Sequence, residues 1–220
     1  MGGGSAPGSG PVGRVRREWE DVPVTDPATE PEYGLPPGQR FAATPRVQHY
    51  GPVPKFKPQS WRLSVMGATE SGRDEHLDVE AFDQLHRTQV TGDLHCVTKW
   101  STPGLAWAGV ATHTLLQLVP PAPDVTHVMA WAEYGYSSNL PLADFAAPTS
   151  LLATHLDGEL LTAEHGYPLR LVVPHLYAWK GPKWLRAVEY LVGERRGFWE
   201  ERGYHTHGDP WSEQRYSYQE

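Results

Sequence analysis

The sequence is poor in cysteine, because Cys96 is the only one among its 220 residues. One thiol cannot close an internal disulfide, and it cannot supply a zinc or iron–sulfur site that needs several cysteines. This composition excludes a disulfide-rich secreted scaffold and fits a reducing compartment. The lone thiol could pack as a small apolar side chain, act as a nucleophile or bind a metal, and composition leaves all three roles open.

Two further features are missing. The formal net charge is −7 and the basic residues are scattered, which gives no reason to expect nucleic-acid binding. No apolar run is long enough to span a bilayer. Arg16 and Arg17 are followed by the acidic residues Glu18, Glu20 and Asp21, where an export signal would have an apolar region. We therefore predict a cytoplasmic protein with no membrane span.

Proline, glycine and tryptophan are abundant instead, with 21, 22 and 9 residues. Many turns and many amphipathic rings suit a strand-rich protein with a carved site better than a helical bundle. Residues 1–45 are rich in Gly, Pro and Ser and lack apolar periodicity, which predicts a disordered or loosely draped extension. Residues 46–220 are predicted to form one mixed α+β domain that is rich in strand.

The spacing of apolar residues predicts individual elements within this domain. In residues 61–65, Trp61, Leu63 and Val65 alternate with polar residues, so they should face the core from one strand. Residues 77–85 have helical spacing. Further strands are predicted in residues 88–101, 128–134, 151–156, 169–174 and 184–193, with a helix toward the end of 104–119 and turns at 134–139 and 157–158.

The stretch GDLHCVTKWS, residues 92–101, surrounds Cys96 with polar groups. A neighbouring lysine or histidine favours the thiolate, which is the form that attacks carbon or binds a metal. From these residues alone, a buried inert cysteine and a functional one are about equally supported. A Cys–His hydrolase that pairs Cys96 with His95 or His175 is one open alternative.

A second stretch, HGYPLRLVVPHLYAWKGPK at residues 165–183, combines cations with turns. Arg170 follows a proline turn, while Lys180 and Lys183 flank Gly181-Pro182. Cations next to backbone N–H groups that a glycine leaves accessible suit a phosphate. The plainer interpretation is a solvated turn with ordinary surface charges.

The C-terminal stretch GYHTHGDP offers His205, His207 and Asp209 as three candidate ligands for zinc or iron. No fourth ligand is evident in the sequence, and short His-x-His stretches are common in loops. We therefore expect these residues to serve as hydrogen-bonding loop residues rather than as a second metal site.

Taken together, these segments resemble the sulfite-oxidase-like molybdopterin-dependent oxidoreductases, in particular the short prokaryotic branch without a haem domain. The resemblance covers about residues 46–216. It rests on four motifs in the family's order: HYGPVP, DLHCVTKWS, HGYPLRLVVPHLYAWKGPKWLRAVEYL and GFWEERGYHTHGDPWSEQRY. It implies a strand-rich α+β fold of the sulfite-oxidase type that binds a molybdenum–molybdopterin cofactor.

The resemblance also implies roles for single residues. The cysteine of the family's loop ligates molybdenum, and this position is Cys96. A high-valent metal acidifies a thiol, so the ligand would be a thiolate. The positions that anchor the pterin phosphate in the family map onto Arg170 and Lys183. His165 stands where relatives often have asparagine.

Five further positions follow from the same resemblance. An N-terminal Asn/His pair that reaches the pterin corresponds to His49 and Tyr50. Thr98 and Gly181 are expected to line the cofactor cavity. Lys99 replaces an arginine that holds sulfite in the best-known eukaryotic members, and a lysine holds an anion only as a point charge. A sulfite oxidase is therefore not implied.

The function that the resemblance implies is oxygen-atom transfer between water and a small substrate, such as an S- or N-oxide or a sulfite-like anion. No haem or iron–sulfur motif is present, so electrons would pass to a separate carrier. The alternatives are a non-catalytic cofactor-binding or interaction module with the same fold and the Cys–His hydrolase.

Overall fold

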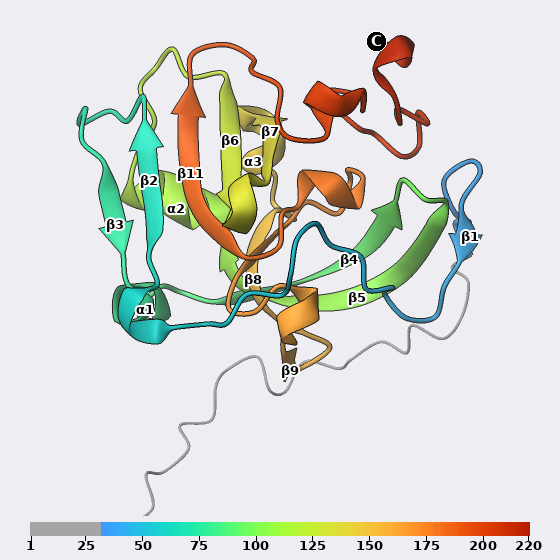
Figure 1. The fold of residues 1–220 in the computed structure, drawn as a ribbon, viewed down its shortest axis with the longest axis horizontal. Helices are drawn as coiled ribbons and strands as arrows, with labels where there is room; N and C mark the ends of the chain where they lie inside the picture. The colour runs from blue at the N-terminus through green and yellow to red at the C-terminus, as the bar shows by residue number, and fades with distance from the viewer. Residues whose placement is uncertain (1–31) are drawn as a thin grey trace, which may run out of the picture.

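The computed structural model describes residues 32–220 (Figure 1). This part contains three α-helices, α1 (Val79–Asp83), α2 (Thr112–Leu118) and α3 (Leu142–Phe145). The strands are β1 (Arg40–Phe41), β2 (Leu63–Gly67), β3 (Glu75–Leu77), β4 (Thr88–Cys96), β5 (Trp100–Ala111), β6 (His127–Ala132), β7 (Ser137–Pro141), β8 (Leu151–Leu156), β9 (Glu159–Leu160), β10 (Arg170–Val172) and β11 (Leu185–Leu191). Every helix within residues 32–220 is too short or too polar to cross a lipid bilayer.

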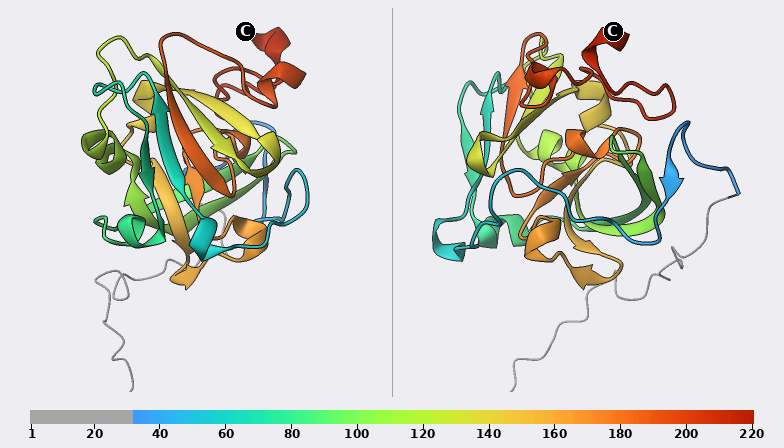
Figure 2. Two further views of the ribbon diagram at one scale, coloured as in Figure 1. Left: turned by 60° about the vertical axis from the view of Figure 1, so that its left-hand side comes forward. Right: turned by 45° about the vertical axis from the view of Figure 1, so that its right-hand side comes forward.

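The strands form two mixed sheets, which Figure 2 shows from two sides. In the first sheet, β4 pairs with one edge of β5 along most of its length. Strands β1 and β8 pair with opposite ends of the other edge of β5, and β8 continues to β9 and β10. The second sheet has the order β3-β2-β11-β6-β7, in which only β2 and β11 are parallel.

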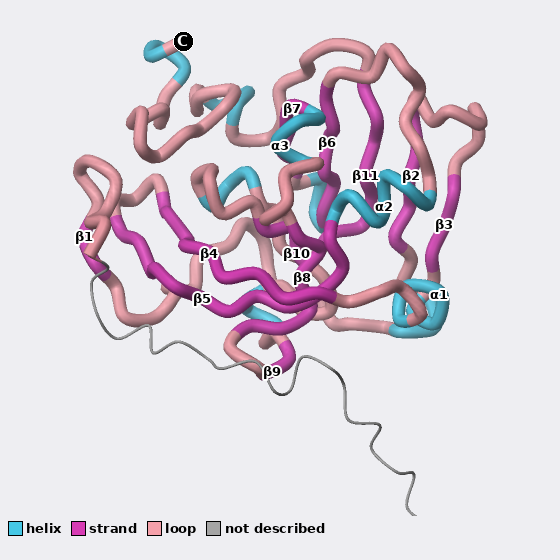
Figure 3. Tube along the Cα trace, turned by 180° about the vertical axis from the view of Figure 1, so that it is seen from behind, coloured by secondary structure: helices cyan, strands magenta, loops and turns pink. Residues whose placement is uncertain are grey.

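The larger hydrophobic core lies between the sheets, because apolar residues of both contribute to it. It includes Leu63 and Val65 of β2, Val188 of β11 and Leu152 of β8, all fully buried. Helix α2 also contributes to this core; Figure 3 shows the helix from behind. A smaller cluster on the other side of the first sheet contains Cys96, so the candidate site begins at the edge of a packed region.

Local sequence explains several of these elements. Helix α1 begins where the side chain of Asp78 accepts a hydrogen bond from the backbone N–H of Ala81, at 2.9 Å. Strand β8 is buried over most of its length and begins with the apolar residues Leu151, Leu152 and Ala153, while the two polar residues that follow, Thr154 and His155, hydrogen-bond to each other. Gly109 of β5 allows β8 to approach, since a Cβ there would lie 2.1 Å from the carbonyl oxygen of Leu152. The predicted strand-rich mixed α+β domain is confirmed.

The aromatic stretch at residues 134–139 differs from its prediction as a turn. Only its start turns, where Tyr134 and Gly135 adopt positive φ. Ser137, Ser138 and Asn139 then form β7 on the edge of the second sheet and are buried. Their polar side chains tolerate burial because Ser138 and Asn139 hydrogen-bond to Glu200, Glu194 and Lys180, a contact that local sequence cannot reveal.

The predicted boundary at residue 46 stays a prediction, and residues 1–31 lie outside the described residues, but residues 32–45 contact the rest of the domain. Arg40 and Phe41 form β1, which pairs in parallel with the start of β5. The hydroxyl of Tyr33 donates to the carboxylate of Asp93 at 2.9 Å. The side-chain amide of Gln39 donates to the carbonyl of Cys96 at 3.1 Å. This segment is therefore attached to the domain, and it contacts the end of β4, where Cys96 lies.

Candidate functional site

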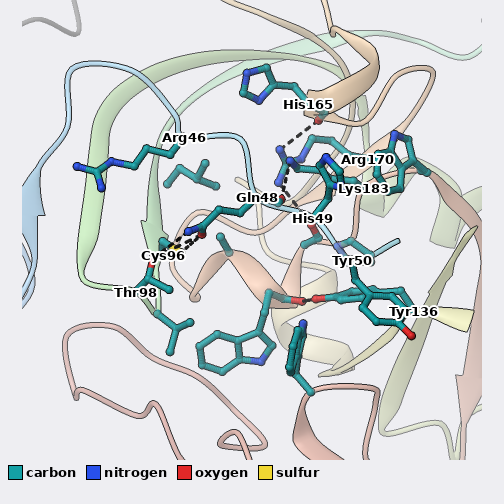
Figure 4. Close-up of a pocket in the computed structure, with 18 of the residues that line it drawn as sticks. Arg46, Gln48, His49, Tyr50, Cys96, Thr98, Tyr136, His165, Arg170 and Lys183 are labelled. Carbon is teal, nitrogen blue, oxygen red and sulfur yellow. Dashed lines mark hydrogen bonds between the residues drawn. The ribbon is translucent and has the colours of Figure 1, made fainter. Parts of the chain in front are cut away.

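A cavity of about 340 Å³ brings together residues that are distant in the sequence (Figure 4). They come from residues 46–50, the end of β4 with the β4–β5 turn, the segment between β6 and β7, His165, the start of β10, the residues between β10 and β11, and the C-terminal segment. The lining includes Arg46, Gln48, His49, Tyr50, Cys96, Thr98, Trp100, Tyr136, His165, Arg170, Trp179, Gly181, Lys183, Trp184, Trp199 and Tyr204.

Cys96 is the last residue of β4 and lines one side of this cavity. The chain reverses immediately after it, and β5 starts at Trp100. The Cys96 thiol lies 3.0 Å from the side-chain oxygen of Gln48 and 3.1 Å from the hydroxyl of Thr98. The sulfur is thus held by neutral polar groups at a cavity wall, which is a suitable position for a metal ligand.

Lys99 was predicted to hold substrate, but it is exposed and does not line the cavity. It adopts φ 68° at the tip of the β4–β5 turn, and its backbone N–H donates to the carbonyl of Cys96 at 3.0 Å. The left-handed conformation belongs to the geometry of a short hairpin loop. In this structure Lys99 shapes the turn, and no cavity contact supports a role in substrate binding.

Arg170 lies on the opposite side of the cavity from Cys96 and is buried, with 3% of its surface exposed. Its guanidinium donates to the carbonyls of His165 and Gly181 at 3.2 and 3.4 Å, and it lies over the ring of Trp107. Its Nε has no hydrogen-bond partner. Burial lowers the pKa of Arg170 to about 10. The structure therefore buries a cation with spare donor capacity.

Lys183 lies beside Arg170 across a bridge between their backbones. Its ammonium donates to the carbonyls of Gln48 and Glu164 at 2.9 and 2.7 Å. Burial and the positive charge of Arg170 lower the pKa of Lys183 to about 7. Within residues 32–220, neither cation forms an ion pair with a carboxylate, so an anion in the cavity would relieve their repulsion.

Two glycines near these cations allow close packing that a side chain would prevent. A Cβ on Gly181 would lie 2.5 Å from the carbonyl oxygen of Leu171. Gly166 adopts φ 114° and packs against the side chains of Arg170 and Lys183. His165 precedes it, and burial together with these cations lowers the pKa of His165, so the ring is neutral at pH 7.

The predicted pair His49 and Tyr50 also lines the cavity, although both side chains are exposed. The ring of His49 packs edge-on against Trp184, and its Nδ1 is 2.9 Å from the carbonyl oxygen of Gly51. Tyr50 packs against Phe198 with ring centroids 4.5 Å apart. Both residues are held at the rim by these contacts.

Gln48 is the important residue that sequence reasoning missed. Figure 4 shows it between Cys96 on one side and Lys183 with Arg170 on the other. Its side chain meets the thiol while its backbone carbonyl accepts from Lys183. Its position directly before His49 was the available indication. The aromatic lining was missed as well, namely Trp100, Tyr136, Trp179, Trp184, Trp199 and Tyr204.

The site accommodates an anionic group that accepts hydrogen bonds. Besides Arg170 Nε, the indole N–H groups of Trp100 and Trp179 are buried and have no hydrogen-bond partner among residues 32–220, and both residues line the cavity. Buried donors are rarely left unsatisfied in folded proteins, so these three point to a ligand. A pterin with a phosphate offers acceptors of this kind, and Cys96 offers a soft ligand for its metal.

The two histidines proposed for a hydrolase are occupied elsewhere. The Nδ1 of His95 lies 2.8 Å from the hydroxyl of Ser101, and burial lowers the pKa of His95. The Nε2 of His175 lies 2.9 Å from a carboxylate oxygen of Asp144, and His175 does not line the cavity. Neither histidine contacts Cys96, which removes the structural basis for a Cys–His hydrolase.

The C-terminal candidates His205, His207 and Asp209 do not converge on one point. His205 accepts from the backbone of His207, whereas His207 contacts Asp144. Asp209 accepts from the backbone of Trp211. No group of three or more ligating side chains within residues 32–220 is arranged to hold a metal ion. The segment does reach the cavity through Tyr204, whereas Trp211 is 49% exposed.

Comparison with known proteins identifies the family. The family described as "Oxidoreductase molybdopterin binding domain" matches residues 50–199. The chain belongs to this family. It is therefore a molybdopterin-dependent oxidoreductase, with a molybdenum-pterin as its cofactor. This confirms the cofactor and the enzyme class that the four sequence motifs implied. The main alternative, a non-catalytic module with the same fold, is therefore not favoured.

Individual relatives give more detail. The chain is 41% identical over 185 residues to the Uncharacterized oxidoreductase YuiH of Bacillus subtilis, covering 84% of this chain and 92% of YuiH. It is 30% identical to the protein-methionine-sulfoxide reductase catalytic subunit MsrP of Gluconobacter oxydans, covering 70% of this chain and 56% of MsrP. It is 26% identical to human mitochondrial sulfite oxidase, covering 72% of this chain but only 34% of that enzyme.

A solved structure supports the fold. The sulfane dehydrogenase SoxCD of Paracoccus pantotrophus superimposes with a TM-score of 0.59 at 23% identity, covering 66% of this chain and 42% of that one. The sulfite-oxidase-type fold predicted from the motifs is thereby confirmed. The chain spans about half of MsrP and a third of human sulfite oxidase, so their activities are not transferred with the fold.

Proposed function

We propose that this enzyme reduces a small neutral S- or N-oxide, with electrons supplied by a separate carrier. The observation that carries the proposal is the layout of the cavity, with a thiol on one side and two cations without carboxylate partners on the other. A cofactor with a metal end and a phosphate end matches this layout. The wall that remains for substrate is aromatic.

The roles of the residues at the metal end follow from their contacts. Cys96 would hold molybdenum as a thiolate after losing its proton. Gln48 and Thr98 lie at hydrogen-bond distance from the sulfur, and each carries a donor that could turn toward the negative sulfur. These two neighbours would therefore fix the orientation of the ligand and tune its basicity.

At the other end, Arg170 and Lys183 would bind the phosphate. The guanidinium is held by two carbonyls, which leaves Nε free to donate, and Lys183 contributes a point charge. Protonated Lys183 is favoured by a nearby dianion, so cofactor binding should raise its pKa again. At this end, Gly181 lines the cavity and Gly166 packs against Arg170 and Lys183, so neither position places a side chain in the way of the phosphate.

The reaction balances as R₂S=O + 2 H⁺ + 2 e⁻ → R₂S + H₂O, or the corresponding equation for an N-oxide. When bound, the molybdenum-pterin would supply the two-electron oxygen-atom-transfer chemistry. The aromatic side chains of the cavity wall would bind and orient the substrate. A sulfite-like anion is less well served, because Lys99 is outside the cavity and the two cations Arg170 and Lys183 lie away from Cys96, where we propose that they bind the phosphate.

The test combines cofactor analysis with a substrate panel. Purified protein should contain molybdenum and pterin near one per chain. With a reduced viologen as donor, it should reduce dimethyl sulfoxide, methionine sulfoxide or trimethylamine N-oxide, and it should oxidise sulfite with ferricyanide at least tenfold more slowly. Loaded protein that turns over none of the oxides would overturn the substrate assignment. Hydrolysis of esters or amides by metal-free protein would instead support the hydrolase.

A further inference from the structure

A groove of about 350 Å³ lies next to the cofactor cavity and plays no part in the proposed chemistry. Three cations line it, Lys55, Lys57 and Arg186. Glu133 is the one carboxylate among the described residues that line it, and this carboxylate lies 3.5 Å from Arg186. Lys55 and Lys57 are exposed and form no ion pair within residues 32–220. The groove therefore carries a local excess of positive charge.

This charge is part of a longer basic segment. Residues 33–69 contain Arg40, Arg46, Lys55, Lys57 and Arg62 but no aspartate or glutamate, in a chain whose net charge is −7. The segment crosses the molecule between β1 and β2, as Figure 1 shows. Its first part lines the cofactor cavity and its second part lines the groove. The rim of the cavity and the groove are thus both lined by this segment, which carries cations and no carboxylate, and we call the two together the basic surface.

The groove and the cavity also share a wall. Trp184 lines both, is 4% exposed, and is fixed by a 2.7 Å hydrogen bond from its indole N–H to the carbonyl of Ala163. Tyr134 packs edge-on against Trp184 from the groove side and His49 packs against it from the cavity side. A group bound in the groove is therefore separated from the cofactor cavity by one side chain.

We infer that this basic surface docks a small acidic electron-carrier protein. The inference rests on the proposed function, which needs a separate carrier. Charge complementarity supports it, since a negatively charged chain repels an acidic partner everywhere except near such a surface. Exposed aromatic rings lie on the same surface, with Tyr50 and Tyr134 each 46% exposed, and tyrosine is enriched in protein interfaces.

The experiment compares two electron donors in charge-reversal variants of the holoenzyme. The protein donor is a reduced plant-type [2Fe–2S] ferredoxin, which is acidic, and the small donor is reduced benzyl viologen. Lys55→Glu combined with Lys57→Glu should lower kcat/KM for ferredoxin about tenfold or more at low salt. The same variant should keep its viologen activity within twofold, because neither lysine lines the cofactor cavity.

Arg73→Glu is the matched control, since Arg73 is equally exposed but follows the opposite end of β2. It should leave kcat/KM for ferredoxin within twofold. Raising the salt concentration should lower kcat/KM of the wild type for ferredoxin. It should also reduce the difference in kcat/KM between the wild type and the double variant. Equal kcat/KM for ferredoxin in wild type and double variant, or faster exchange with a basic c-type cytochrome, would overturn the docking proposal. If the wild-type holoenzyme shows no oxide reduction with benzyl viologen, the proposed function is wrong instead.

Discussion

At the scale of single residues, the site depends on groups whose bonding is incomplete within residues 32–220. In this part of the chain Arg170 and Lys183 bind carbonyls but no carboxylate, and the indole N–H groups of Trp100 and Trp179 have no acceptor. Such groups cost stability in the cofactor-free protein and recover it when an acceptor arrives. The binding of the cofactor and the stability of the domain should therefore be linked.

Replacement of Cys96 by serine tests the metal end. A hydroxyl is a harder and less acidic ligand than a thiol, so the redox properties of the metal should change. We expect pterin content to stay near that of the wild type, because the phosphate contacts are intact, while activity falls by orders of magnitude. The checks are pterin fluorescence after oxidative release and the viologen assay. Full activity of a molybdenum-containing Cys96→Ser protein would exclude the ligand role.

Replacement of Arg170 by alanine tests the phosphate end. Loss of a charge-assisted hydrogen bond costs about 1.5–3 kcal/mol, or about ten- to a hundredfold in cofactor affinity. Pterin content of the purified variant should fall accordingly. Arg170→Lys keeps the charge without the planar fork and should give an intermediate content. Wild-type occupancy in a variant that lacks both Arg170 and Lys183 would contradict the assignment.

The lowered pKa of Lys183 predicts a pH dependence. Between pH 7 and about 10, the unfolded chain holds a proton on this lysine that the cofactor-free folded protein does not. Stability rises with pH wherever the unfolded state binds more protons. The Tm of the cofactor-free wild type should therefore increase relative to Lys183→Met as the pH is raised through this range. Parallel Tm curves for the two proteins would show that Lys183 has an ordinary pKa.

At the scale of elements, the C-terminal segment is attached through a buried ion pair. Lys180 and Glu200 are both fully buried, with their charged atoms 2.7 Å apart. Lys180 also donates to the side chain of Asn139 in β7 and to the carbonyl of Thr206. Trp199 and Tyr204 lie on either side of Glu200 along the chain and line the cavity. The pair therefore joins the turn before β11 to one aromatic wall of the site.

Breaking this pair should loosen that wall. Glu200→Gln leaves the Lys180 ammonium buried without a counter-charge, which costs about 3–5 kcal/mol. At about 2–4 °C per kcal/mol for a domain of this size, the Tm should drop by roughly 6–20 °C. The double variant Lys180→Met with Glu200→Leu removes both charges and should recover most of the loss. If the double variant melts as low as Glu200→Gln, packing rather than uncompensated charge is responsible.

At the scale of the whole molecule, the cavity is assembled from chain segments that are distant in sequence. Gln48, Cys96, Arg170 and Tyr204 come from four different parts of the chain. The first strand matters for the same reason, because β1 pairs with the strand that follows the cysteine turn. An early segment of the chain thereby contributes to the position of Cys96, the metal ligand in our proposal.

Two truncations separate the parts of this early segment. A protein that starts at residue 46 loses β1 and the hydrogen bond from Gln39 to the Cys96 carbonyl. At about 1 kcal/mol per hydrogen bond, its Tm should fall by several degrees and its molybdenum content should decrease. A protein that starts at residue 32 keeps these contacts and should match the full chain in both measurements. Equal Tm and metal content for the two truncations would show that β1 is dispensable.

The sequence alone determined the family and the strand-rich fold, and it singled out three residues that the structure places at one cavity. Cys96, Arg170 and Lys183 were predicted because their residue types carry specific chemistry within recognisable motifs. Most of the strands were predicted too, since the alternation of apolar residues is a local property of the chain. The cytoplasmic location stays a prediction.

Only the tertiary structure decided which polar residues face the cavity. Lys99 lies in a left-handed turn and does not line the cavity. Gln48, which is 48 residues before Cys96 in the chain, contacts its sulfur. The strand β7 forms because partners from the C-terminal segment satisfy its buried polar side chains. These outcomes depend on contacts between residues far apart in the chain. Local patterns of hydrophobicity and turn residues do not specify such contacts, because the contacts form only when distant parts of the chain fold together.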